Sequence, residues 1–209
     1  MTEKIFQKPS IELGQSSLLL HALATCHSIS FVNKEMIGDP LDIKMFSSTG
    51  WDYEDSSENE HLEYPIVKPP LGGMKGLKIS IIRNFPFSSD LQRQSVIVKN
   101  ELQEYPFIFL KVRYLTNSSE KKLLKGAPEM VASKCTSVPV NFTTELEKLT
   151  RRGYRVLALA GREIKETIAQ VKKVERDDCE DDLSLLGLLV MQVGHVTVES
   201  LCERFLEPT

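Results

Sequence analysis

Four short segments in the middle of the chain, each rich in β-branched and aromatic residues, follow one another with polar or turn-prone residues between them. They are Lys78 to Asn84, Ser95 to Lys99, Phe107 to Tyr114 and Lys121 to Lys125. Residues of these types pack well on a pleated surface, and short connections join neighbouring antiparallel strands. The sequence therefore predicts an antiparallel sheet over this region.

Two helices are predicted before the sheet. Ser16 to Cys26 is a compact apolar stretch, which suits a buried helix. A loop over residues 32–37 leads to Asp39-Pro40, a pair typical of an N-cap followed by proline at the first helical position. The next apolar residues, Leu41, Met45 and Phe46, then fall on one face of a short amphipathic helix.

After the sheet, Thr143 to Arg152 has a helical period closed by a glycine, and Tyr154 to Ala160 is short and apolar, as expected of another strand. The acidic run Asp177 to Asp182 is predicted to be a solvated loop before an apolar strand, Leu183 to Met191. The predicted fold class is α+β, with a mostly antiparallel β-sheet flanked by helices.

One segment has a different composition from the rest of the chain. Residues 50–76 collect acids, serines, prolines and glycines, and can bury little apolar surface. We therefore expect an exposed, flexible insertion between the N-terminal helices and the sheet.

Charge and composition exclude several classes of function. A net charge of -3 provides no excess of basic residues for a phosphate backbone, so no nucleic-acid partner is expected. The apolar run Leu183 to Met191 is about half of the roughly 20 residues that span a bilayer, so we predict a soluble chain without direct membrane insertion. The 4 cysteines and 4 histidines lack ligand-like spacing, which predicts free thiols and no metal site.

A possible site of chemistry lies where the fourth predicted strand ends. In Leu123 to Glu129, Lys125 closes an apolar strand, and Gly126 and Ala127 let the backbone turn sharply toward a helix. Such a turn can aim an ammonium group into a cleft. An ordinary strand-to-helix connection with a solvent-exposed lysine explains the same pattern.

Four segments resemble, in the expected order, the motifs of the nucleotide-binding domain of P-type cation-transporting ATPases. Gly38 to Asp42 is similar to G-D-P-x-[ED], and Phe85 to Ser89 with Arg93 to Val96 is similar to F-x-F-S…S-V. Lys125 to Glu129 is identical to K-G-A-P-E, and Gly153 to Ala160 is similar to G-x-R-x-[LI]-A-x-A. The resemblance covers about Leu18 to Gln192 and implies the α+β fold of that domain.

The resemblance extends to one branch of the family. Ala24 to Ser28, Gly38 to Phe46 and Phe85 to Ser89 look like the type V-B branch, which contains polyamine exporters of endosomes and lysosomes. It implies a multi-pass parent protein in those membranes, with this chain as a cytosolic, soluble part of it.

The resemblance also implies a set of ATP-binding residues. Phe87 would stack on the adenine ring, a contact worth about 1–3 kcal/mol by analogy with base stacking. Asp42 would accept a hydrogen bond from the adenine amino group, and Lys125 would sit in the pocket. Gly126 would leave room for the nucleotide, and Arg155 would reach the phosphates. Without the resemblance, Phe87 fits a core aromatic of the sheet equally well.

The chain departs from the family pattern in two respects. Gln92 occupies the position where many relatives have a pocket lysine, so Arg93 beside it would be the substitute. The D-K-T-G-T motif of the phosphorylated aspartate and the T-G-D-G-x-N-D motif that binds magnesium do not occur in these 209 residues. The resemblance thus implies a chain that binds ATP but does not hydrolyse it alone, with Mg²⁺ held mainly by other domains.

The same resemblance divides the chain. Residues 1–15 diverge, 16–182 would form the nucleotide-binding domain, 183–192 would begin a truncated phosphorylation domain, and 193–209 would be a tail outside the family. The chain thus looks like a truncated isoform or fragment whose partner is the phosphorylation domain of a parent transporter.

A second function is compatible with this division. Leu183 to Met191 would have lost its own sheet and would expose an apolar edge. A non-catalytic fragment could use this edge to dock on a full-length relative. An independent soluble hydrolase is not supported, because no activated nucleophile is visible in the sequence.

Overall fold

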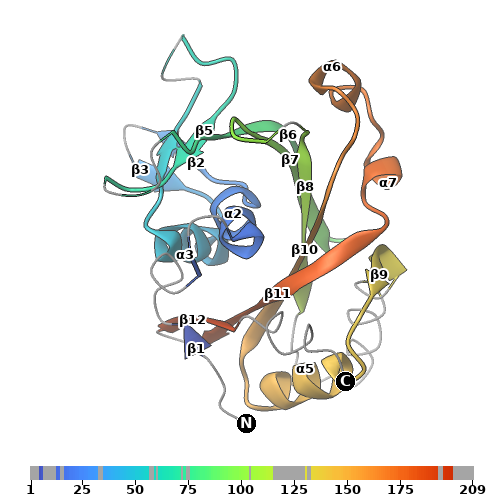
Figure 1. Ribbon diagram of the computed structural model, residues 1–209. Coiled ribbons are helices and arrows are strands. Elements are labelled where there is room, and N and C mark those ends of the chain that lie inside the picture. The colour runs from blue at the N-terminus through green and yellow to red at the C-terminus, as the bar shows by residue number, and fades with distance from the viewer. Residues whose placement is uncertain are drawn as a thin grey trace.

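The computed structural model describes residues 5–6, 13–14, 17–32, 35–56, 59, 61–71, 73, 76–103, 105–114, 130, 133–192 and 195–199. These residues fold into a ten-stranded sheet flanked by helices, together with a separate two-stranded hairpin, which confirms the predicted α+β class (Figure 1). The helices are α2 (Leu18–Thr25), α3 (Pro40–Thr49), α5 (Phe142–Arg151), α6 (Ile168–Val171) and α7 (Arg176–Cys179).

The sheet is antiparallel except for one short strand. Its order is β1-β12-β11-β10-β8-β7-β6-β5-β4, and β9 (Cys135–Ser137) pairs with β11 in parallel. The other bounds are β1 (Ile5–Phe6), β4 (Asp52–Glu54), β5 (Ile66–Lys68), β6 (Ile79–Ser88), β7 (Arg93–Asn100), β8 (Phe107–Tyr114), β10 (Arg155–Glu163), β11 (Leu183–Gln192) and β12 (His195–Glu199). The first three predicted strands are confirmed as β6, β7 and β8, and Lys121 to Lys125 lies outside the described residues.

Both faces of the sheet are buried, so its central strands carry apolar residues at successive positions. Along β10, Leu157 and Leu159 pack against the cluster that contains α2 and α3, whereas Val156, Ala158 and Ala160 pack against the cluster that contains α5. The alternation follows from the two-residue period of a strand. Figure 1 shows the sheet curving around α2 and α3, with α5 on its other side.

The two N-terminal helices form where the sequence predicts them. Residues 19–25 of α2 are all buried. Asp39 caps α3, because its side chain accepts a hydrogen bond from the amide of Leu41 at 2.8 Å, and α3 ends at Gly50, whose φ of 65° favours glycine. Met45 and Phe46 are buried on the predicted face. Among the described helices, none is long and apolar enough to cross a membrane.

Two segments predicted to be irregular contain strands. The predicted loop at 32–37 is part of a hairpin of β2 (Ser30–Val32) and β3 (Glu35–Ile37). The predicted insertion at 50–76 contributes β4 and β5 to the sheet, and Trp51 and Val67 within it are buried. The acidic composition therefore concealed two short strands, of which β5 pairs with β6 and β4 pairs with β5.

The apolar segment Leu183 to Met191 does not expose an edge, so that expectation is wrong. As β11 it pairs with β10 on one side and with β12 on the other. Leu183 and Leu188 are fully buried. The docking function that depended on this edge loses its structural basis, whereas the division of the parent into domains at residue 182 stays a prediction.

Gly161 lies at a close approach between β10 and β8, which gives a stability prediction. A Cβ at this position would lie 2.7 Å from the carbonyl oxygen of Ile108 and 2.7 Å from the ring of Phe109. Because backbone must move to admit it, Gly161→Ala should lower the free energy of unfolding by about 1–3 kcal/mol. Denaturant unfolding followed by the fluorescence of the single tryptophan, Trp51, would measure this loss. An unchanged midpoint would contradict the close strand approach.

Candidate nucleotide-binding site

Three of the predicted site residues share one end of the sheet. Phe87 is near the end of β6, and Arg93 and Arg155 begin β7 and β10. In the register, Arg93 pairs with Val112 of β8, which pairs in turn with Ala158 of β10. Arg155 lies three residues before Ala158, so it stands roughly 10 Å farther along the strands than Arg93.

The side chains at this end differ in their access to solvent. Phe87 is 37% exposed and Arg155 is exposed at the surface. Gln92, at the predicted pocket-lysine position, has a φ of 51° in the β6–β7 turn. Its side-chain nitrogen Nε2 donates to the carbonyl of Ser89. Lys125 and Gly126 lie outside the described residues. A partly exposed aromatic side chain and an exposed cation thus lie at this end of the sheet.

Asp42 is buried, and both of its carboxylate oxygens already have protein partners. The side chain of Lys111 forms an ion pair with Oδ1, and the amide of Ser28 donates to Oδ2 at 3.1 Å. The two charged side chains are 3% and 2% exposed. A direct contact of Asp42 with adenine would require this pair to open, so in this structure Asp42 joins α3 to β8 beneath the surface.

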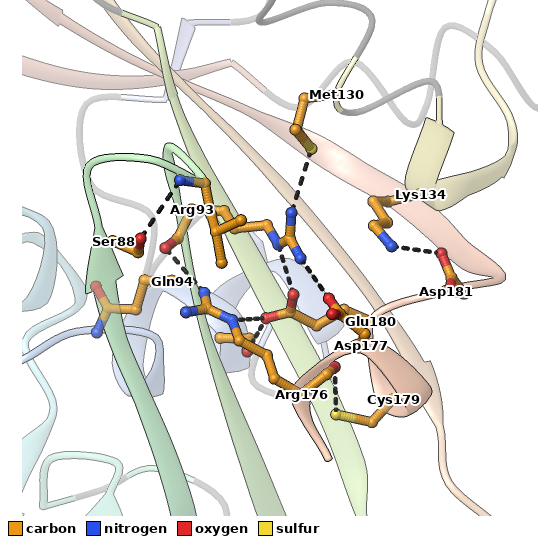
Figure 2. A network of polar contacts seen from close by, with 12 residues as sticks. Ser88, Arg93, Gln94, Met130, Lys134, Arg176, Asp177, Cys179, Glu180 and Asp181 are labelled. Atoms are coloured by element: carbon orange, nitrogen blue, oxygen red, sulfur yellow. Dashed lines mark hydrogen bonds and ion pairs between the residues drawn. The ribbon is translucent and has the colours of Figure 1, made fainter.

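Arg93 is also buried, and its guanidinium is paired with carboxylates. Its Nε donates to Glu180 at 2.5 Å, and its Nη2 donates to Asp177 at 2.9 Å. Its side chain is 4% exposed. Figure 2 shows the guanidinium directed toward Glu180 and Asp177. In this conformation carboxylates neutralise the charge of Arg93, so its role as the substitute for a pocket lysine stays a prediction.

The same network corrects the expectation for the acidic run at 177–182. Part of the run forms the end of α7, and Glu180 is fully buried instead of solvated. Its carboxylate accepts hydrogen bonds from Arg93, from the hydroxyl of Ser95, and from Nε of Arg176 at 2.8 Å. A buried carboxylate is stable only with such partners.

The side chains of two neighbouring residues of β7 form hydrogen bonds on opposite faces of the sheet. Arg93 is directed to α7, whereas the side chain of Gln94 donates to the hydroxyl of Ser28 at 2.8 Å, on the side of α2 and α3. Figure 2 shows Gln94 directed away from Glu180. Each face of the sheet thus carries its own buried polar cluster beneath the end that presents Phe87.

Sequence reasoning missed the buried partners Lys111 and Glu180. A signal existed for Lys111, because a lysine inside the apolar strand Phe107–Tyr114 requires a buried counter-charge. No comparable signal marks Glu180, which is one acid among several and contacts Arg93 across 87 residues of sequence.

The other titratable groups near the Asp42 face are inert at neutral pH. Burial raises the pKa of the Cys26 thiol to about 12. Burial also lowers the pKa of His27 to about 4, so this imidazole is neutral at pH 7. Among the described residues, Cys26, Cys135 and Cys179 are free thiols, and no group of metal-ligating side chains is found.

Comparison with known proteins identifies the family of this domain. Residues 70–192 match the family model of the P-type ATPase cytoplasmic domain N. The chain is 36% identical over 189 residues to the human polyamine-transporting ATPase 13A2, with 83% of the chain and 15% of the relative covered. It is 34% identical over 207 residues to polyamine-transporting ATPase 13A3 of Macaca fascicularis, with 87% of the chain and 16% of the relative covered.

A third relative has a more general name. The chain is 38% identical over 184 residues to the probable cation-transporting ATPase 13A5 of Mus musculus, with 83% of the chain and 14% of the relative covered. The chain thus spans about a seventh of the length of these relatives. The matched residues 70–192 include β6, β7, β8, β10 and β11, which form the centre of the sheet. This chain belongs to the family of P-type ATPase cytoplasmic N domains and is similar to the polyamine- and cation-transporting 13A ATPases.

Proposed function

We propose that this chain is the ATP-binding part of a P-type transporter that moves a cation, with polyamines as its substrate class, across an endosomal or lysosomal membrane. The observation that carries the proposal is the family match over 70–192. The names of the relatives support the substrate class, because two of them are polyamine-transporting ATPases. The endosomal or lysosomal location rests on the resemblance to the type V-B branch.

ATP binds, in this proposal, at the end of the sheet that presents Phe87 and Arg155. Phe87 stacks on the adenine ring, and Arg155 contacts the phosphates as a planar cation with several donors. Lys125 and Gly126 join the pocket by resemblance. Asp42 and Arg93 support it from within, because their side chains are committed to buried ion pairs.

Binding by this chain is proposed to be weak and without turnover. The aspartate that accepts phosphate in the family belongs to a D-K-T-G-T motif, which is not in these 209 residues. Mg²⁺ and the terminal phosphate would be held mainly by the phosphorylation domain of the parent. We therefore expect a dissociation constant for ATP near the millimolar level, which corresponds to a binding free energy of about -4 kcal/mol.

The chain offers a matched pair of variants for testing the adenine contact. Phe87 and Tyr105 are 37% and 36% exposed, but Tyr105 precedes β8 at the opposite end of the sheet. Phe87→Ala should weaken ATP binding by about 1–3 kcal/mol, because a stacked aromatic is lost. Tyr105→Ala should leave it unchanged. Displacement of a fluorescent ATP analogue measures both, and equal effects of the two variants would contradict the assignment of Phe87.

A further inference from the structure

The hairpin that carries Phe87 is held at its tip by a residue from α7. Arg176 donates from Nη1 to the carbonyl of Pro86, the residue just before Phe87, at 3.3 Å. It donates from Nη2 to the carbonyl of Arg93 at 2.9 Å. One guanidinium thus connects the end of β6 with the beginning of β7.

A buried acid fixes the orientation of this guanidinium. Nε of Arg176 donates to Oε1 of Glu180 at 2.8 Å, and the Arg176 side chain is 18% exposed, whereas Glu180 is fully buried. Glu180 is itself fixed by Arg93 and Ser95 of β7. Because Arg is a planar fork of donors, its contacts with two carbonyls and a carboxylate define a single geometry.

The chain around α7 is attached to β6 at a second place. Nη1 of Arg83 donates to the carbonyls of Lys172 at 3.0 Å and Val174 at 2.5 Å, and the guanidinium lies 4.5 Å from the ring centre of Phe85. The segment that supplies Arg176 is therefore anchored independently of Glu180.

We propose that Arg176, oriented by Glu180, is a positioning residue that holds the Phe87 hairpin in the conformation that binds the adenine ring. The proposal rests on the proposed function, but the ordering of the hairpin can be measured without ATP. Ordering the hairpin in advance removes an entropic cost from binding.

Arg176→Met is the decisive variant, because Glu180 keeps its bonds to Arg93 and Ser95 and no buried charge is left alone. NMR relaxation should show the amide order parameters of Phe87 to Gln92 falling from about 0.85 to below about 0.6. ATP affinity should fall about 3- to 10-fold. Arg176→Lys keeps the charge but not the fork, and should loosen the hairpin to an intermediate degree.

Lys134→Met is the matched control. It removes the 2.8 Å ion pair between Lys134 and Asp181, which lies beside the same network (Figure 2). Among the described contacts, Lys134 makes none with the hairpin. It should change neither hairpin order nor ATP affinity. An ordered hairpin in Arg176→Met, or a loosened hairpin with unchanged ATP affinity, would overturn the positioning role. If Arg176→Met loosens the hairpin but the wild type does not bind ATP, the result would support the positioning of the hairpin by Arg176 and would contradict the nucleotide function instead.

Discussion

Replacing Lys111 with methionine is expected to lower the free energy of unfolding by about 3–5 kcal/mol. Lys111 and Asp42 are both almost completely buried, and they are paired with each other. Removal of the ammonium leaves the carboxylate of Asp42 in an apolar environment with only the amide of Ser28 as a partner among the described contacts. Desolvation of that charge is the source of the loss. Denaturant unfolding followed by Trp51 fluorescence measures it.

A double-mutant cycle separates the pair from general damage to the core. Asp42→Asn keeps an acceptor for Ser28 but removes the charge, so the double variant with Lys111→Met should be more stable than Lys111→Met alone. Lys148→Met is the control, because Lys148 is 58% exposed and pairs with Glu145 on the surface. It should cost less than about 1 kcal/mol. Additive losses in the cycle would contradict a coupled buried pair.

Acidification from pH 6.5 to pH 4 is expected to remove about 3 kcal/mol of stability through His27 alone. Burial, assisted by the nearby charge of Lys111, lowers its folded-state pKa from 6.5 to about 4. The unfolded chain therefore binds the proton in this window while the folded chain does not. The contribution is fully present above pH 6.5 and is lost as the pH falls toward 4.

His27→Gln isolates this effect from the titration of carboxyl groups. The imidazole bonds to the carbonyl of Ala24 at 2.9 Å and accepts from the amide of Ile29, and an amide side chain can form similar bonds without titrating. The free energy of unfolding measured across pH 4–7 should have a smaller slope in this variant than in the wild type. Identical slopes would show that His27 is not the group responsible.

Local patterns predicted much of the fold. Asp39 and Pro40 mark the start of α3 because capping is decided by adjacent residues. The strands β6, β7 and β8 were predictable from β-branched and aromatic runs. The helix α5 was predictable from its helical period, which a glycine ends, and β10 from the short apolar run that follows this glycine. These features require information from only a few neighbouring positions.

The features that sequence reasoning missed depend on distant partners. β4 and β5 are three residues each, and β5 pairs with β6 whereas β4 pairs with β5. Glu180 was assigned to a solvated run because its partner Arg93 is 87 residues away. Phe87 and Arg155 were placed in the site by resemblance, and only the strand register brings them to one end of the sheet. Asp42 was identified as a polar site residue, but its ion pair with Lys111 could not be read from spacing.

Nucleotide binding by this chain can be tested by an NMR titration of the isotope-labelled chain with ATP, comparing the wild type with Lys125→Ala. We expect saturable shifts at Phe87, Gly126 and Arg155, with a dissociation constant near the millimolar level, and we expect these shifts to be lost in the variant. Folded spectra that ignore ATP at about ten times that concentration would contradict nucleotide binding by this chain. Shifts that persist undiminished in Lys125→Ala would contradict the pocket as proposed.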